Sequence, residues 1–240
     1  MNERPQAALI DVVILCGGMG TRLRSVEKDK PKPMIDFNDR PFLDLLIDYV
    51  ESYGFKRFIL CSGHKGNHIK EYFGKKRDGK TYQISQENDP MGTAGAIKHA
   101  ETVITSDTFL VMNGDSFCPI ELNTFLDFHY SKNALASIAL APMTDPLDYG
   151  RVALGEEDQI KRFNEKTTTT SSGWVNAGIY LFSKKFLGLI PDGKPVSLEK
   201  DIFPSLAGKG LFGFTSQSRL LDIGTPERLK LARTLLSERN

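Results

Sequence analysis

The sequence predicts an α/β fold with a mixed, mostly parallel central sheet flanked by helices. In the first half of the chain, short apolar runs alternate with longer amphipathic runs, which is the pattern of strands and helices in turn. The short runs are apolar throughout, as expected of strands covered on both faces of a sheet. The chain has 240 residues and therefore fits a single compact domain over 1–240.

Strands and helices follow one another in order along the first half. Strands are expected at DVVILC (11–16), RFILCS (57–62), TYQIS (81–85) and TFLVMN (108–113). Helices are expected at 41–54, 64–73, 93–103 and 121–131. Apolar residues form one stripe along the first of these helices, and Gly54 is expected to end it.

The second half is richer in strands, which are expected at 135–141, 150–155, 159–164, 174–182 and 219–224. A final helix follows, with Thr225 as its N-cap and Pro226 in its first turn. No internal repeat and no long linker interrupts the chain, so one domain remains the expectation.

Composition and charge limit which binding partners and which cellular compartment are expected. The 31 Lys and Arg residues nearly balance the 30 Asp and Glu residues, so no global charge favours a nucleic acid or an anionic membrane. No apolar run reaches the length of a membrane span, and the first ten residues do not resemble a signal peptide. Three widely spaced cysteines, Cys16, Cys61 and Cys118, fit neither a disulfide framework nor a zinc site. A cytoplasmic protein is expected.

The strongest chemical signal is LCGGMGTRLRSVEKDKPKPM (15–34), directly after the first expected strand. Its glycines, Gly17, Gly18 and Gly20, permit positive φ angles and let successive N–H groups point at phosphate oxygens. The segment is not a Walker loop, since Thr21 and Arg22 follow the last glycine. Leu23 stands where a dinucleotide-binding fingerprint needs its third glycine, which disfavours a nicotinamide oxidoreductase.

Two cations accompany this loop. Arg22 offers a planar, bidentate guanidinium. Lys32 lies between Pro31 and Pro33, and the following proline is expected to hold Lys32 in an extended conformation on a stiff segment. Two placed cations suit a triphosphate.

Two aspartates are expected at the carboxyl ends of strands. Asp115 in NGDS follows the strand at 108–113, and Asp222 in DIGTPE ends the strand at 219–224. A single aspartate at a strand end is more often a cap or a turn residue. The metal hypothesis therefore depends on the pair, since two carboxylates completed by water and phosphate oxygens are the usual ligands of Mg²⁺.

QENDPMGTAGAI (86–97) leads from a strand into a helix. Gln86 carries both a donor and an acceptor, which suits the edge of a base. Gly92 and Gly95 would let the backbone approach a flat ring. Thr93 is expected to cap the helix in either case.

Together with further segments, these motifs resemble the sugar-1-phosphate nucleotidyltransferases over nearly the whole chain. The family signature is a loop ending GTRL followed by PKP, and the other matching segments are QENDPMGTAGAI, NGDS, YGRV, NEK, VNAGIYLF, SLEKDIFP and DIGTPE. RSVEKDKPKPM followed by RPFL resembles the opening of the D-glycero-α-D-manno-heptose 1-phosphate guanylyltransferases. The resemblance implies a Rossmann-like nucleotidyltransferase fold, with a nucleotide-binding part at about 8–133 and a sugar-phosphate-binding part at about 134–240.

The resemblance also implies the reaction and the site. GTP and the heptose 1-phosphate would give GDP-heptose and pyrophosphate by in-line attack on the α-phosphate, for a cell-surface polysaccharide. The implied metal site is Mg²⁺ on Asp115 and Asp222. The implied catalytic residues are Arg22, Lys32, Asp115 and Lys166. The nucleotide would contact Leu15, Gly17, Gly18, Gly20, Thr21, Gln86, Gly92 and Thr93. The sugar phosphate would contact Gly150, Glu165, Lys166 and Asn176.

Other readings stay open from the sequence. Mannose 1-phosphate with GTP, or glucose 1-phosphate with UTP or dTTP, are alternative substrate pairs. A protein of another class, which binds a nucleotide sugar and regulates a partner without catalysis, is disfavoured by the intact Arg22, Lys32, Asp115 and Asp222. The oligomeric state is also open, with a homo-oligomer among the options.

Overall fold

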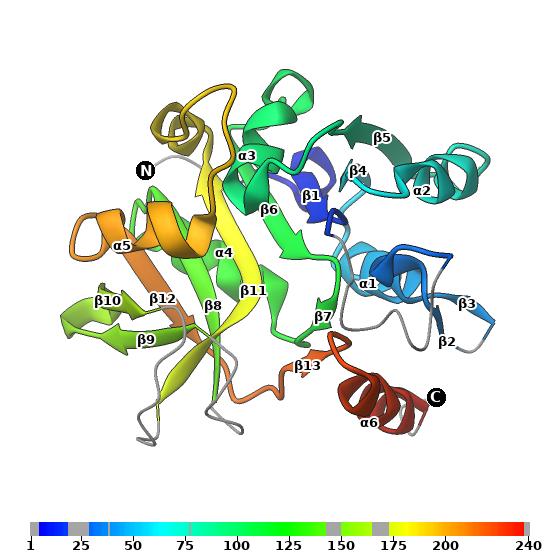
Figure 1. Cartoon of the computed structure of the whole chain (residues 1–240). Helices are drawn as coiled ribbons and strands as arrows, with labels where there is room; N and C mark the ends of the chain where they lie inside the picture. The colour runs from blue at the N-terminus through cyan, green and yellow to red at the C-terminus, as the bar shows by residue number, and fades with distance from the viewer. Residues whose placement is uncertain are drawn as a thin grey trace.

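The computed structural model describes residues 5–18, 29–37, 39–76, 78–142, 150–164 and 173–237. It confirms the predicted fold class, a mixed central sheet flanked by helices (Figure 1). The main path of the sheet runs β10-β9-β11-β6-β1-β4-β5, and β8 and β12 extend it from β11.

The first half of the chain builds a parallel block. Its strands are β1 (Asp11–Leu15), β4 (Arg57–Ser62), β5 (Thr81–Gln86) and β6 (Thr108–Asn113). β1 lies parallel between β4 and β6, and β5 lies parallel beside β4. The connecting helices are α1 (Phe42–Glu51), α2 (Gly66–Phe73) and α3 (Gly92–His99). These bounds follow the predicted ones, although α3 ends earlier and a 3-10 turn (Glu101–Val103) completes the segment.

The second half is organised around a long strand, β11 (Trp174–Ser183), which is antiparallel to β6, β8 and β9. The other strands are β8 (Ala136–Pro142), β9 (Arg151–Leu154), β10 (Ile160–Asn164) and β12 (Leu211–Thr215). β12 lies parallel to β8 and is an addition to the strands expected from the sequence. The mixed character of the sheet therefore comes from this half.

Short elements complete the chain. Two-residue strands form two small ladders, β2 (Asp36–Phe37) with β3 (Arg40–Pro41) and β7 (Ser116–Phe117) with β13 (Leu221–Asp222). The remaining longer helices are α4 (Leu122–Ser131) and α6 (Pro226–Ser237). A π-helix (Leu198–Ile202) runs into α5 (Phe203–Leu206). Single 3-10 segments are Ala7–Leu9, Lys32–Met34, Glu156–Asp158 and Lys184–Leu189.

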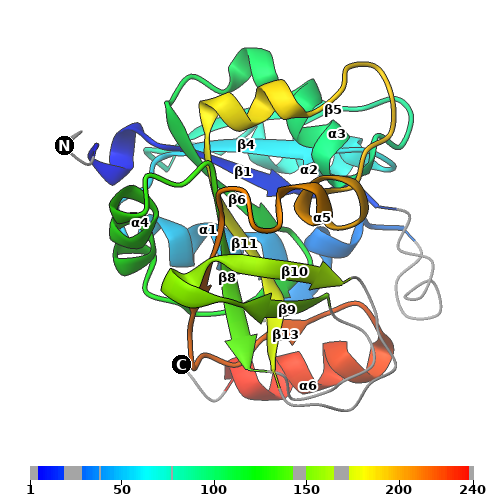
Figure 2. The same cartoon turned by 90° about the vertical axis from the view of Figure 1, so that its left-hand side faces the viewer.

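Side chains alternate across the sheet and supply a hydrophobic core on each face. Along β1, Val12 and Ile14 belong to one core and Val13 to the other. The first core takes in buried residues of α1, α2, α4 and α6, and the second takes in those of α3, the 184–189 segment and α5. Figure 2 shows α5 in front of the sheet and α1 behind it. Helices therefore cover both faces, as predicted.

The predicted start of the last helix is confirmed. α6 begins at Pro226, and the N–H of Arg228 donates to the side-chain oxygen of Thr225 at 3.3 Å, which is an N-cap bond. Over the part of the chain that the structure describes, every helix is too short or too polar to cross a membrane.

Candidate active site

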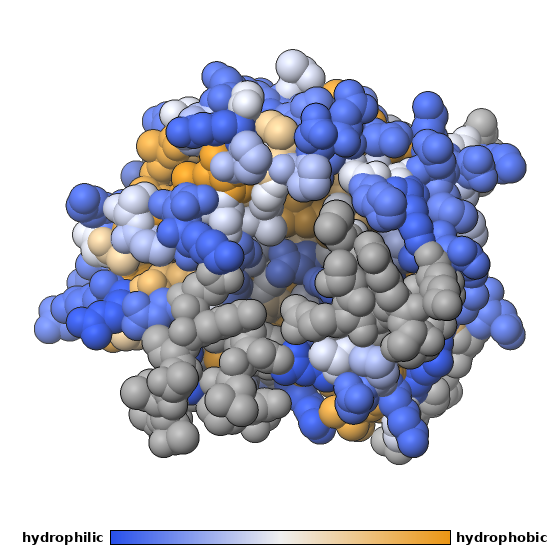
Figure 3. Space-filling model, viewed as in Figure 1, coloured by the Kyte–Doolittle hydropathy of each residue, from blue (hydrophilic) through white to orange (hydrophobic). Residues whose placement is uncertain are grey.

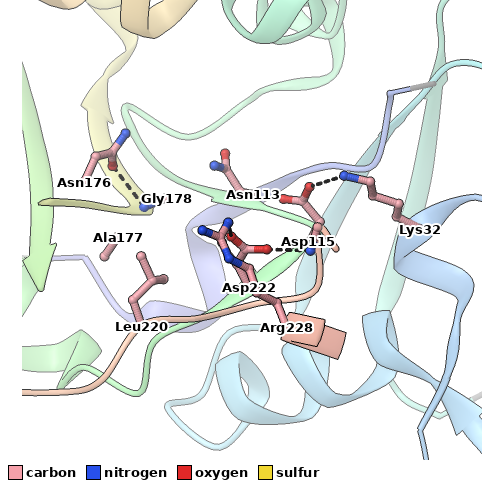
Figure 4. Close-up of a pocket in the computed structure, with 11 residues that line it drawn as sticks. Lys32, Asn113, Asp115, Asn176, Ala177, Gly178, Leu220, Asp222 and Arg228 are labelled. Atoms are coloured by element: carbon pink, nitrogen blue, oxygen red, sulfur yellow. Dashed lines mark hydrogen bonds and ion pairs between the residues drawn. The ribbon is translucent and has the colours of Figure 1, made fainter. Parts of the chain in front are cut away.

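A polar pocket lies at the carboxyl end of β6, where the two halves of the sheet meet. Figure 3 shows this face of the molecule hollowed near its centre, with hydrophilic residues in the hollow. The pocket is lined by Lys32, Asn113, Asp115, Ser116, Asn176, Ala177, Gly178, Leu220, Asp222, Gly224 and Arg228. Four of the predicted site residues, Lys32, Asp115, Asn176 and Asp222, therefore share one pocket (Figure 4).

The β7–β13 ladder brings Asp115 and Asp222 together from distant parts of the chain. Asp222 pairs with Ser116 in this ladder. In the next step, the N–H of Ile223 donates to the carbonyl oxygen of Asp115 at 3.0 Å. The two aspartates thus come from neighbouring positions on adjacent strands and point into the same pocket. The juxtaposition on which the metal hypothesis depends is present.

Lys32 reaches Asp115 because the end of β1 and the 31–34 turn approach closely at Gly114. A side chain at Gly114 would come within 2.8 Å of the Leu15 carbonyl oxygen and 3.2 Å of the Pro33 ring. The Lys32 ammonium lies 3.3 Å from Oδ2 of Asp115. The prediction of an extended Lys32 is wrong, because Lys32 begins a single 3-10 turn whose bonds run from Met34 and Ile35 back to Pro31 and Lys32.

Donors from Arg228 and Gly224 hold the carboxylate of Asp222. Its Oδ2 accepts from Nη1 of Arg228 at 2.7 Å, and its Oδ1 accepts from the N–H of Gly224. Both side chains of the ion pair are mostly buried. Sequence reasoning missed Arg228, although its place three residues past the Thr225 N-cap puts it in the first turn of α6, facing back toward DIGTPE. Arg228 orients the carboxylate and adds a second cation to the pocket.

Asn176 is aimed at the pocket by an irregularity in β11. The pairing register of β11 with β8 shifts between Asn176 and Tyr180, and Gly178 has a φ of +73°. Oδ1 of Asn176 accepts from the N–H of Gly178, and Nδ2 donates to the Tyr180 hydroxyl, both at 2.9 Å. Burial raises the pKa of Tyr180 well above its ordinary value, so this hydroxyl stays protonated and orients the amide.

Asn113 is a second pocket residue that sequence reasoning missed. It ends β6 and its Oδ1 is buried without a hydrogen-bond partner among the described residues. A buried acceptor without a partner is costly in the free protein. It is therefore suited to accept from a ligand hydroxyl or a bound water. The signal for it was the asparagine at the end of a buried strand, immediately before the glycine of NGDS.

The donor set of the pocket fits a hard divalent cation such as Mg²⁺. Asp115 and Asp222 supply carboxylate oxygens, and Mg²⁺ characteristically uses one or two carboxylates and fills its other positions with water and phosphate oxygens. No cluster of three or more His, Cys, Asp or Glu side chains that could hold a metal occurs in the described ranges. These residues therefore offer no fully protein-ligated site, and Asp115 and Asp222 would need water and phosphate oxygens to complete the coordination of a metal ion.

The glycine-rich loop follows β1 beside this pocket. Leu15 ends β1, and its carbonyl oxygen accepts from the N–H of Gly114 at 2.9 Å. Gly17 is exposed, and Gly18 has a φ of +137°, which confirms the positive φ expected in this loop. The predicted site residues Gly20, Thr21 and Arg22 lie outside the described residues.

Gln86, Gly92 and Thr93 lie on the far side of the loop, at the end of β5 and the start of α3. Gly92 has a φ of +73°, and a side chain there would meet the carbonyl oxygen of Val196. The expectation that Thr93 caps α3 is wrong, because the helix begins at Gly92 after Met91. The Thr93 hydroxyl instead donates to Glu199 and accepts from the N–H of Leu198, both at 2.8 Å, which docks α3 on the π-helix segment.

The predicted sugar-phosphate residues are described in part. The carbonyl oxygen of Gly150 accepts from the N–H of Asn176 at 3.0 Å, and a side chain at Gly150 would meet the ring of Phe163 at 3.0 Å. Gly150 therefore lies beside a pocket residue. Glu165 and Lys166 lie outside the described residues.

Comparison with known proteins agrees with this architecture. The chain is 36% identical over 218 residues to the D-glycero-alpha-D-manno-heptose 1-phosphate guanylyltransferase of Campylobacter jejuni subsp. jejuni serotype O:2, which covers 91% of this chain and 96% of the relative. It is 35% identical over 222 residues to the mannose-1-phosphate guanylyltransferase of Mycobacterium tuberculosis. That match covers 91% of this chain and 62% of the relative, so the chain spans about three fifths of the mycobacterial protein.

A solved structure shows the same fold. HddC from Yersinia pseudotuberculosis complexed with GMP-PN superposes with a TM-score of 0.81 at 33% identity, covering 95% of this chain and 99% of that one. Residues 11–238 match the family described as nucleotidyl transferase. The strand order, the polar pocket at the sheet's carboxyl edge and this match over nearly the whole chain lead to one conclusion: the chain belongs to the nucleotidyl transferase family of enzymes.

Proposed function

We propose that this enzyme joins GTP to D-glycero-α-D-manno-heptose 1-phosphate, giving GDP-heptose and pyrophosphate. The observation that carries the proposal is the convergence of Asp115, Asp222 and Lys32 in one pocket at the carboxyl edge of the sheet. The guanine nucleotide is supported by relatives named as guanylyltransferases and by the solved complex with GMP-PN. The heptose is supported by the relative that this chain matches over 96% of its length.

The proposed reaction needs alignment and charge neutralisation more than acid–base chemistry. The attacking oxygen of a sugar 1-phosphate is already anionic at neutral pH, so no general base has to remove a proton. Two anions must instead be held in line while charge moves onto the leaving pyrophosphate. Lys32 and Arg228, which line the pocket, would supply cations for this purpose, and Arg22 and Lys166 would add two more.

Each residue has a proposed task. Asp115 and Asp222 would hold Mg²⁺, which when bound screens the charge of the phosphate oxygens. Lys32 would contact the α-phosphoryl oxygens, and Arg22 would stabilise the departing pyrophosphate. Asn176 and Oδ1 of Asn113, which has no partner among the described residues, would face the sugar hydroxyls. A cytoplasmic location and a role in cell-surface polysaccharide assembly accompany this proposal.

The test is pyrophosphate release with Mg²⁺, crossing the ribonucleoside triphosphates and dTTP against heptose, mannose and glucose 1-phosphates. We expect release with GTP and the heptose phosphate, and none when EDTA removes the divalent ion. Release with another pair would keep the reaction and correct the substrates. Absence of release from every pair, with nucleotide-sugar binding intact, would replace the proposal with a non-catalytic binding protein.

A further inference from the structure

Each of the two pocket carboxylates is paired with a cation of the protein itself. The Lys32 ammonium lies 3.3 Å from Oδ2 of Asp115, and Nη1 of Arg228 lies 2.7 Å from Oδ2 of Asp222 (Figure 4). These four are the charged side chains among the described residues that line the pocket. Two positive charges therefore balance two negative ones, and this lining offers little net attraction to a divalent cation that arrives alone.

The two ion pairs differ in strength. The side chain of Asp115 is 42% exposed and its contact with Lys32 is long, so water and salt screen this pair. The side chain of Asp222 is only 15% exposed, and its contact with Arg228 has the length of a strong charge-assisted hydrogen bond. Arg228 is therefore the cation that competes more strongly with a metal ion for a carboxylate oxygen of this pocket.

Asp222 has a second anchor that does not involve Arg228. Its Oδ1 accepts from the N–H of Gly224, and a side chain at Gly224 would approach that oxygen to 2.8 Å, so the turn closes tightly around it. The N–H of Ile223 is bonded to the carbonyl oxygen of Asp115, which fixes the backbone between them. The Arg228 guanidinium can therefore leave Oδ2 while the carboxylate keeps its place in the pocket.

The place of Arg228 in α6 indicates that it serves the pocket more than the helix. It lies in the first turn, at the positive end of the helix dipole, where a cation is unfavourable. The helix is anchored elsewhere by Arg233, which donates to the carbonyl oxygen of Asp36 at 3.0 Å and lies over the ring of Phe37. Loss of the Arg228 charge should therefore change the pocket while α6 stays docked.

We propose that Arg228 competes with the divalent cation for Oδ2 of Asp222, and that the phosphate of the sugar 1-phosphate relieves this competition by drawing the guanidinium to itself. This inference rests on the proposed function for its metal ion and its sugar phosphate. Arg228 lines the pocket together with Asn176, the residue proposed to face the sugar. A phosphate offers a guanidinium two anionic oxygens at once. Metal ion and sugar phosphate therefore each raise the affinity of the enzyme for the other.

The test measures Mn²⁺ binding to the whole protein without turnover, from the electron paramagnetic resonance signal of the free ion. Mn²⁺ takes the same oxygen ligands as Mg²⁺. Arg228→Met keeps an apolar stem and removes the charge, so it should bind Mn²⁺ about 5- to 150-fold more tightly than the wild type, the usual range of a coupling between two ligands. Saturating heptose 1-phosphate should tighten Mn²⁺ binding in the wild type and do so less in Arg228→Met. Arg233→Met, on the same helix, is the matched control and should keep the wild-type values.

A purely structural role for Arg228, holding Asp222 ready for the metal ion, predicts the opposite sign. Weaker or unchanged Mn²⁺ binding in Arg228→Met would overturn the proposal. Equal Mn²⁺ affinities of the wild type with and without heptose 1-phosphate would also overturn it, and this measurement does not depend on the folding of a variant. Arg228→Lys, which keeps the charge on a shorter reach, should change Mn²⁺ affinity in the same direction by a smaller factor. If the wild type transfers no nucleotide but these affinities are as expected, the proposed function fails while this inference stands.

Discussion

The two halves of the sheet build their share of the pocket in different ways. In the parallel half, β1 pairs with β4 and β6 in unbroken register, and β4 does so with β5. In the half around β11, the register shifts between Asn176 and Tyr180, and again in β10 between Ile160 and Arg162. Regular pairing aligns the ends of the parallel strands, so loops emerge from a single edge. Irregular pairing instead re-aims individual side chains.

The pocket depends on both the regular and the irregular strand pairing. Asp115 reaches it after the end of β6, and Lys32 reaches it from the 3-10 turn that packs against that end. Asn176 reaches it through the irregular part of β11. Asp222 arrives on a two-residue strand from the end of the chain. Nucleotide groups are therefore expected to meet a regular surface, and sugar groups a surface whose shape depends on local backbone detail.

The largest expected effect comes from neutralising either of the two pocket carboxylates. Asp115→Asn and Asp222→Asn should each lower kcat for pyrophosphate release by about 100-fold or more at saturating Mg²⁺, since each removes a charged ligand from the phosphate site. Asp48→Asn, which breaks only an exposed ion pair with Arg40, is the matched control and should retain activity. Near wild-type turnover in either pocket variant would remove that half's carboxylate from the proposed metal site.

The next largest effect tests whether the irregular backbone of β11 at Gly178 is needed for the shape of the pocket. Gly178→Ala places a side chain at a φ of +73° and 2.8 Å from Nδ2 of Asn113. We expect it to lower the free energy of unfolding by about 2–3 kcal/mol, combining backbone strain with overpacking. Gly193→Ala has a similar φ of +68° but no atom within 4 Å, so it isolates the strain and should cost about 1 kcal/mol.

Urea denaturation of the two variants measures the difference, and the KM for sugar phosphate shows whether the pocket moves. Because Gly178 lies beside Asn176 and Asn113, Gly178→Ala should also raise that KM, whereas Gly193→Ala should not. Equal free energies of unfolding in the two alanine variants would mean that the Asn113 side chain moves aside without cost. The packing around Gly178 would then be less rigid than the short distance indicates.

Sequence alone predicts the parallel half closely. The bounds expected for β4 and β6 coincide with those in the structure, because strands buried on both faces are apolar along their whole length and end where polarity returns. The place of Asp115 after β6 follows from the rule that ligands bind at the carboxyl ends of parallel strands. The strand expected at 219–224 is shorter in the structure, and Asp222 reaches the pocket on the antiparallel β7–β13 ladder. The family match over residues 11–238 supports the same alignment.

What the sequence did not predict depends on contacts between distant segments. The two-residue strands β7 and β13 have no pattern of their own and exist because they pair with each other. Arg228 becomes a pocket residue only through its bond to Asp222, and Thr93 leaves the capping position because Glu199 and Leu198 offer better partners.

The smallest expected effect lies in the core of the irregular half. His129 of α4 is 2% exposed, and its Nδ1 lies 2.9 Å from the hydroxyl of Ser137 in β8. Burial lowers the pKa of His129 from 6.5 to about 4. The folded protein therefore holds this imidazole neutral, while the unfolded chain takes up a proton as the pH falls below about 6.5.

The burial of His129 should therefore leave the free energy of unfolding unchanged above pH 6.5. Below that pH it should lower the free energy of unfolding progressively as the pH falls toward 4. Between pH 7.5 and pH 5 this loss amounts to about 2 kcal/mol. In His129→Gln the free energy of unfolding should be lower at pH 7.5, but its decrease on going to pH 5 should be smaller than in the wild type by about that amount. The exposed His68 gives the control variant His68→Gln, which should keep the wild-type pH dependence. An unchanged pH dependence in His129→Gln would contradict this account, because the burial of His129 would then not be the cause of the loss of stability in acid.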